Sequence, residues 1–295
     1  LHMINLFYEE SYWMGTNRMT GPRAVVRNLL DSLEDQKIPY AVNEEKYDHN
    51  FIVQYDRNGY IKHSNLTLEN CVIGPQIWFF DEHVKELQQH PERYKSIIVP
   101  SQWTKDLAVN KFGFERVETW PVGIPLPEIK RDDDVHQFDC LIYSKRRSVQ
   151  ELNAVVDLLQ KKKMSFRTLV YGNYNQEELA LMCSRAKFCF LLNGTESQGI
   201  AVQEIMSHNV PIFSWDVSEW SDMGPRYSIS ATSIPYWSDE CGEVFRSSDP
   251  PLDHILMEET FDKFCSKIDT YNPRKYVEEN LSYEQSVKRL LEILC

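Results

Sequence analysis

Short apolar runs alternate along this chain with amphipathic stretches of helical length, and this alternation limits the folds that the chain can adopt. Runs of about four to eight residues such as Ser96–Val99 and Phe138–Tyr143 favour strands that are buried on both faces. The stretches between them, such as Val149–Lys161, place apolar side chains on one helical face. Strands that alternate with helices are typical of parallel sheets covered by helices. The sequence therefore predicts an α/β protein.

A proline-rich segment divides this alternation into two sets. Residues 121–134 read PVGIPLPEIKRDDD, and the three prolines and the charge run cannot continue a helix or an inner strand. The 295 residues are long enough for two cores. We predict a first domain over 1–125 and a second over 126–274, with a C-terminal helix at about 275–295 packing back on the first. In doubly wound domains of this kind, ligands bind at the carboxyl ends of the strands, so the site is expected in a cleft between the two domains.

Composition excludes several classes of function. Lys and Arg number 32 against 44 Asp and Glu, a net charge of −12, which argues against a protein dedicated to nucleic acid or to anionic membranes. No apolar run approaches the roughly 18–20 residues of a transmembrane helix, and no signal-peptide pattern is present. The seven cysteines are odd in number and lack a C-x-x-C pair, which favours a reducing, cytoplasmic compartment. The D-x-D at Asp132–Asp134 falls in the charge run of the predicted linker, so we expect no metal site.

Two glutamates stand eight positions apart in the segment ESQGIAVQE, between two predicted strands. Gly199, at the expected start of a helix, allows a ligand to approach the backbone, and the N–H groups of a first helical turn favour an anion. Glu196 and Glu204 then flank one anion pocket, where carboxylates accept hydrogen bonds from sugar hydroxyls. Spacing alone also fits a loop glutamate followed by a surface glutamate of the first helical turns.

Three adjacent cations follow the predicted strand Phe138–Tyr143 directly. Lys145, Arg146 and Arg147 stand at the carboxyl end of that strand in an otherwise acidic chain. A guanidinium binds phosphate through two parallel hydrogen bonds, so the segment is suited to an anion. A solvated basic loop is the alternative, and the sequence leaves open which of the three side chains points inward.

The sequence resembles the retaining glycosyltransferases of the GT-B fold, most closely family 4. ESQGIAVQEIMSHNVPIFSW is similar to the E-x7-E motif of that family, in the same order of strand, loop, helix and strand. IIVPSQWTKDLAVNKFGFERVETWPVGI resembles the end of its first domain and its hinge, and GPRAVVRNLLDSL the helix after its glycine-containing first loop. Residues between Tyr40 and Pro91 match only in layout. The resemblance implies two Rossmann-like domains facing a central cleft.

The resemblance also implies roles for individual residues. Glu196 contacts hydroxyls of the donor sugar at the reaction centre, and Glu204 contacts the ribose of the nucleotide. Lys145 and Arg146 hold the leaving diphosphate, although the family usually separates its Arg and Lys by several residues. Further donor-binding candidates are Ser197, Gln198, Gly199, Ile200, Ala201, Arg147, Gly15 and Thr16. On the acceptor side the candidates are Arg18, Asp81 and His83.

These observations predict a glycosyltransferase that moves a sugar from a nucleotide diphosphate sugar, with UDP-sugar as the first expectation, to a glycan hydroxyl with retention at the anomeric carbon. Neither a cofactor nor a metal is expected, because the cations and the helix end would stabilise the departing diphosphate. One alternative is an inverting transferase of the same fold, which needs a side-chain base in its N-terminal half. The other is a non-catalytic subunit that binds sugar nucleotides. The donor sugar, the acceptor and the oligomeric state are not specified by the sequence.

Overall fold

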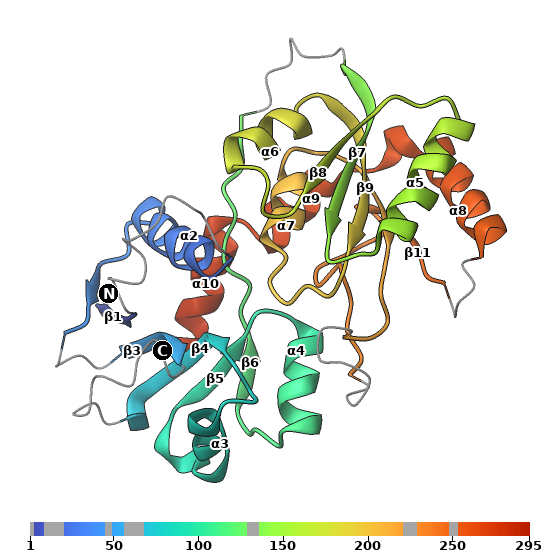
Figure 1. Cartoon of the computed structure of the whole chain (residues 1–295). Helices are drawn as coiled ribbons and strands as arrows, with labels where there is room; N and C mark the ends of the chain where they lie inside the picture. The colour runs from blue at the N-terminus through green and yellow to red at the C-terminus, as the bar shows by residue number, and fades with distance from the viewer. Residues whose placement is uncertain are drawn as a thin grey trace. The chain divides into compact units, whose positions relative to one another are not determined.

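The structure, a computed structural model, describes residues 3–8, 21–44, 49–55, 68–128, 136–220, 229–247 and 253–295 (Figure 1). The chain divides into two compact units. The first comprises Leu1–Gly123 together with Leu281–Cys295, and the second is Ile124–Asn280. The linker D-x-D at Asp132–Asp134 lies outside the described residues.

The first unit contains a parallel sheet in the order β2-β1-β3-β4-β5-β6. Its strands are β1 (Ile4–Phe7), β2 (Tyr40–Val42), β3 (His49–Tyr55), β4 (Cys71–Ile77), β5 (Ser96–Val99) and β6 (Val117–Thr119). Its helices are α2 (Gly21–Asp35), α3 (Glu82–Gln89), α4 (Gln102–Asp106) and α10 (Tyr283–Leu294), with short 3₁₀ turns at Leu68–Asn70 and Pro91–Arg93. The apolar face of α2, which includes Val25, Leu29 and Leu33, is buried. Its 3.6-residue periodicity therefore predicts the packed face correctly.

One helix of the first unit differs from the simplest expectation. The sequence suggests a single helix over Ser101–Lys111, but α4 is followed by a π-helical turn over Leu107–Lys111. This wider turn buries Leu107 and Ala108, and the amide of Phe114 donates to the carbonyl of Ala108 at 3.0 Å.

The last helix, α10, belongs to the first unit although it lies far away in sequence. It packs against α2, and Trp120 Nε1 donates to the carbonyl of Ser286 at 3.0 Å. Ser286 Oγ in turn donates to the carbonyl of Pro121 at 2.9 Å, and Arg289 Nη2 donates to Glu118 at 2.7 Å. Helix α9 (Pro273–Asn280), which precedes it, belongs to the second unit and packs there on α7 (Ile200–Ser207).

The second unit contains a parallel sheet in the order β11-β10-β9-β7-β8. Its strands are β7 (Phe138–Lys145), β8 (Phe166–Val170), β9 (Ala186–Asn193), β10 (Ile212–Trp215) and β11 (Gly242–Phe245). Its other helices are α5 (Val149–Lys161), α6 (Gln176–Cys183), α7 (Ile200–Ser207) and α8 (His254–Ser266), with a 3₁₀ turn at Ile268–Thr270. Helices α5 and α8 pack on one face of the sheet, and α6, α7 and α9 lie on the other (Figure 1). Both units are thus Rossmann-like α/β domains, as predicted.

Aromatic side chains fill the core between the sheet and α8. The rings of Phe213 and Phe261 meet edge to face with centroids 5.2 Å apart, and Phe190 and Phe213 do so at 5.0 Å. Phe188 and Phe264 extend the cluster. Edge-to-face pairs of this kind add about 0.5–1.5 kcal/mol each beyond the burial of their area. The core therefore fixes the strands whose carboxyl ends carry the candidate site.

The strand order of the second unit changes direction between β7 and β9. From β7 the chain moves outward to β8, and it then returns to add β9, β10 and β11 on the opposite side of β7. Ligands of open α/β sheets bind at the carboxyl ends of the strands at such a switch point. In this unit the pair at that position is Lys145 of β7 opposite Asn193 of β9.

Candidate active site at the β7–β9 switch point

Lys145 and Glu196, predicted from separate segments, meet at the switch point. Lys145 Nζ lies 2.6 Å from Glu196 Oε1, and the two side chains are only 16% and 10% exposed. Asn193 Nδ2 donates to the same carboxylate oxygen at 3.3 Å. The ammonium of Lys145 also lies 4.5 Å from the centroid of the Tyr171 ring, a cation–π contact. A cation and a carboxylate are therefore held together with little access to water, where electrostatic interactions are strengthened.

Two tyrosines, one buried and one half-buried, lie beside this ion pair. Tyr143 of β7 and Tyr174, in the loop after β8, share a hydrogen bond of 2.7 Å between their hydroxyls. Burial raises the pKa of the Tyr143 hydroxyl far above its usual range, and Tyr174 and the negative charge of Glu196 add to the effect. Burial raises the pKa of Tyr174 as well. Both hydroxyls therefore remain neutral near neutral pH and act only as hydrogen-bonding groups.

Gly199 occupies a position that favours glycine. It is the N-cap of α7 with φ 59° and ψ 41°, the left-handed region. A Cβ there would lie 3.1 Å from Pro235 Cγ. The helix starts at Ile200, one residue after the predicted start, because Gly199 makes the turn that leads into it. The amides of Ile200 and Ala201 belong to the first helical turn, whose N–H groups have no partner within the helix and favour an anion.

Glu204 lies one turn inside α7 and is held by a neighbouring helix. Gln176 Nε2, at the start of α6, donates to Glu204 Oε1 at 2.7 Å. The Asn175 side chain caps α6 by accepting from the Glu178 amide at 2.8 Å. Our sequence reasoning did not single out Gln176, Tyr171 or Tyr174. Their signal is their position between the carboxyl end of β8, which adjoins β7, and the first residue of α6.

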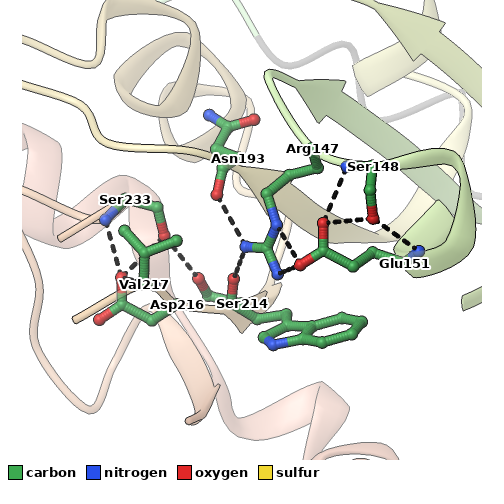
Figure 2. Close-up of polar contacts among 9 residues, drawn as sticks. Arg147, Ser148, Glu151, Asn193, Ser214, Asp216, Val217 and Ser233 are labelled. Carbon is green, nitrogen blue, oxygen red and sulfur yellow. Dashed lines mark hydrogen bonds and ion pairs between the residues drawn. The ribbon is translucent and has the colours of Figure 1, made fainter. Parts of the chain in front are cut away.

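Arg147 has a different environment from Lys145, and Figure 2 shows the polar contacts of Arg147. Its Nη1 donates to the carbonyls of Asn193 at 3.0 Å and Trp215 at 2.9 Å. Its Nη2 lies 2.6 Å from Glu151 Oε1, its guanidinium lies 4.8 Å from the centroid of the Trp215 ring, and its side chain is 6% exposed. Glu151 also accepts from the Ser148 amide at 2.8 Å, which closes the first turn of α5. Arg147 thus joins the carboxyl ends of β9 and β10 to α5.

Arg146 separates these two side chains by a left-handed backbone turn. Its φ is 55°, an uncommon value for a residue with a side chain. The amide of Gly194 donates to the carbonyl of Lys145 at 2.7 Å, and a Cβ on Gly194 would lie 3.3 Å from Arg146 Cβ. The turn at Arg146 therefore lets Lys145 face Glu196 while Arg147 points toward the strand ends.

The remaining predicted residues lie in three places. Ser197 and Gln198 belong to the turn before α7, and Gln198 Nε2 donates to the hydroxyl of Tyr236 at 3.3 Å. Asp81 and His83 lie in the first unit, where Asp81 Oδ1 caps α3 by accepting from the His83 amide at 2.9 Å. Gly15, Thr16 and Arg18 lie outside the described residues.

Two features are absent from the described part of the chain. Among those residues, no three or more His, Cys, Asp or Glu side chains gather into a group that could hold a metal ion. Nor does any described helix combine the length and the apolar character that crossing a membrane requires.

Comparison with solved structures identifies the architecture. AviGT4, a glycosyltransferase involved in avilamycin A biosynthesis, superposes with a TM-score of 0.59 at 10% identity, covering 100% of this chain and 97% of its own. Sucrose-phosphate synthase from Thermosynechococcus elongatus superposes with a TM-score of 0.56 at 13% identity, covering 99% of this chain and 98% of its own. The lipopolysaccharide outer core galactosyltransferase WaaB gives 0.56 at 11% identity, over 99% and 98%. The fold is GT-B.

Other GT-B structures are larger than this chain. A point variant of S. aureus TarM matches with a TM-score of 0.56 at 12% identity, and the chain spans 58% of it, while it spans 61% of the matched chain of the GtfA/B complex. No family model and no curated protein sequence matches the chain. At identities of 10–13%, the likeness shows the GT-B fold alone.

Proposed function

We propose that this protein is a glycosyltransferase that uses a nucleotide diphosphate sugar. One observation carries the proposal: the ion pair of Lys145 with Glu196 lies at the switch point of a Rossmann-like sheet in a GT-B chain. Glu204 and the first turn of α7 follow in the same unit. The structure of the TarM variant contains UDP, which supports a uridine nucleotide as the first ligand to test.

We assign the groups as follows. The diphosphate binds at the first turn of α7, with Lys145 and Arg146 supplying positive charge. Glu204, held by Gln176, accepts hydrogen bonds from the ribose. Glu196 accepts hydrogen bonds from hydroxyls of the donor sugar while Lys145 neutralises its charge.

The same groups account for catalysis. As the glycosidic bond breaks, negative charge grows on the leaving diphosphate and positive charge on the anomeric carbon. Cations and helix N–H groups that are already in place stabilise this separation of charge without rearranging. The carboxylate of Glu196 lies on the side of the sugar, where the positive charge develops. Transfer with retention at the anomeric carbon to a glycan hydroxyl is our proposal, and it comes from the family resemblance.

The nucleotide specificity is tested with the free ligands. We expect one nucleoside diphosphate to raise the midpoint of thermal unfolding more than the others, because a ligand of the folded state stabilises it by RT ln(1 + [L]/Kd). UDP is the first to be tested.

Glu204→Gln should lower the affinity for that diphosphate by about tenfold, since one charge-assisted hydrogen bond to the ribose is lost. Glu177→Gln, on the exposed surface of α6, is the matched control and should have no effect. Equal affinities in both variants would contradict the assignment of Glu204. Diphosphate binding without turnover of any nucleotide sugar would instead favour a non-catalytic subunit.

Removal of divalent metal tests the electrostatic assignment. Because Lys145, Arg146 and the start of α7 supply the positive charge, we expect sugar transfer to continue in the presence of EDTA. The measurement is the initial rate of nucleoside diphosphate release with a glycan acceptor, with and without chelator. Loss of activity that Mg²⁺ or Mn²⁺ restores would show that a metal ion carries the diphosphate instead.

A further inference from the structure

A second buried carboxylate lies at the carboxyl end of the sheet, outside the E-x7-E motif. Asp216 directly follows β10, and its side chain is 1% exposed. Its Oδ1 accepts from the amides of Val217 at 2.9 Å and Ser233 at 2.7 Å, and from the hydroxyls of Ser233 and Thr232 at 2.8 Å each (Figure 2 shows the bonds to Val217 and Ser233). Its Oδ2 accepts from Arg246 Nε at 3.1 Å and Nη2 at 2.8 Å. One carboxylate thus gathers donors from three separate parts of the chain.

The segment that Asp216 holds, residues 232–236, lies against the turn 196–199. Three contacts join the two segments. They are the Glu196 amide to the Thr232 carbonyl at 2.9 Å, Gln198 Nε2 to the Tyr236 hydroxyl at 3.3 Å, and Pro235 Cγ in the space beside Gly199. The backbone that carries Glu196 is therefore supported by a segment whose own anchor is Asp216.

We propose that Asp216 is a positioning residue, which fixes Glu196 opposite Lys145 through segment 232–236. This inference rests on the function proposed above. An ionised carboxylate can accept all of these bonds at once, and charge-assisted bonds are shorter and stronger than neutral ones. An asparagine keeps the shape but turns one oxygen into an amide donor, which then faces the Ser233 amide or the Arg246 guanidinium. The bonds to Oδ1 are broken in the first orientation and lose their charge assistance in the second, so the anchor of segment 232–236 is weakened in either case. The side chain of Asp216 is 1% exposed and leaves no surface for a substrate.

Asp139 offers a control, because it is a carboxylate that also accepts several hydrogen bonds, at the opposite end of the sheet; its side chain is 26% exposed. It follows the first residue of β7 and accepts from the Ser165 amide at 2.9 Å, the Ser165 hydroxyl at 2.7 Å and Lys187 Nζ at 2.7 Å. Asp139→Asn therefore removes a comparable network without touching segment 232–236. A general loss of stability would affect both variants, whereas loss of positioning would affect only Asp216→Asn.

The first experiment does not depend on activity. Hydrogen exchange of the Glu196 amide, which donates to the Thr232 carbonyl, is followed by NMR in both variants. We expect it to become at least about tenfold faster in Asp216→Asn, since local opening of the turn becomes easier. In Asp139→Asn it should stay unchanged. A rate equal to that of the natural chain in folded Asp216→Asn would overturn the proposal, whether or not the protein transfers sugar.

The second experiment asks whether Asp216 acts through Glu196. We expect Asp216→Asn to lower kcat by about 10- to 100-fold while diphosphate affinity changes less than about threefold, since the lost positioning matters most in the transition state. In a Glu196→Gln background the same change should have little further effect on kcat, because residues that act as a unit are not additive. If the effects of Asp216→Asn and Glu196→Gln on kcat are fully additive, the role of Asp216 is merely structural and the proposal is overturned.

A further variant keeps the test decisive if Asp216→Asn does not fold. Thr232→Val removes the hydroxyl that donates to Asp216 but keeps the carbonyl that accepts from Glu196. It should make hydrogen exchange of the Glu196 amide faster, by a smaller factor than Asp216→Asn does. An unchanged exchange rate would overturn the proposal. If the natural chain transfers no sugar at all, the proposed function fails, and the exchange experiment still decides whether Asp216 positions this turn.

Discussion

Glu196→Gln is expected to lower sugar transfer by about 100-fold or more, with affinity for free nucleoside diphosphate within about threefold of the natural chain. In our assignment Glu196 faces the donor sugar, which the free diphosphate lacks. Its charge, balanced by Lys145 at 2.6 Å, matters most when the anomeric carbon becomes positive. A 100-fold loss corresponds to about 2.7 kcal/mol of transition-state stabilisation.

The measurement combines steady-state kinetics with calorimetric titration of diphosphate. Lys145→Ala should lower both the rate of sugar transfer and the affinity for diphosphate, because in our assignment its ammonium contacts the diphosphate as well as the carboxylate. Glu177→Gln is again the control. If Glu196→Gln abolishes diphosphate binding while Glu204→Gln leaves it intact, the orientation of the motif is reversed. If neither change affects binding or turnover, the two glutamates are a chance spacing and the transferase proposal loses its main support.

Arg147→Ala is expected to destabilise the second unit by about 3 kcal/mol, which is the scale of removing one partner from a largely buried charge pair. The change leaves the carbonyls of Asn193 and Trp215 without their shared donor, and it leaves Glu151 without its cation. Urea unfolding monitored by circular dichroism gives the loss of stability. Diphosphate affinity, measured well below the unfolding transition, should stay within about threefold, because the contacts of Arg147 hold strand ends.

Arg167→Ala provides the comparison for this prediction, since Arg167 is an exposed arginine of neighbouring β8. It should cost less than about 0.5 kcal/mol, as surface substitutions usually do. If Arg147→Ala proves as stable as Arg167→Ala but no longer binds diphosphate, Arg147 is a ligand-binding cation and the structural role assigned to it is wrong.

Local sequence signals predict the second unit well. Apolar runs indicate β7, β9 and β10 to within about two residues, because strands buried on both faces must be apolar along their length. Gly199, taken as the start of the helix, places α7 to within one residue. Glu196 before the helix and Glu204 inside it follow from the same reasoning. The features that could be predicted are the strand and helix positions that residues close together in sequence determine.

Contacts between distant segments could not be predicted in the same way. Lys145 and Arg147 are chemically similar and two residues apart, and only the left-handed turn at Arg146 separates their roles. Gln176 donates a hydrogen bond to Glu204, 28 residues away in sequence, and Arg246 donates to Asp216, 30 residues away. Nothing in either local sequence indicates such a partner, because register between separate elements decides it. The roles assigned to Gly15, Thr16 and Arg18 stay predictions.

The membership of α10 in the first unit has a consequence for how this chain is made. The first sheet is complete in sequence by Thr119, yet the Trp120 indole N–H donates to Ser286, and α2 packs against α10, both in residues 283–294. The second unit, Ile124–Asn280, is one continuous stretch that leaves the ribosome before α10 does. Synthesis therefore supplies all of the second unit before the helix that packs on α2 of the first unit is made. The first unit, although it begins first, can therefore complete its folding only after the second unit has been made.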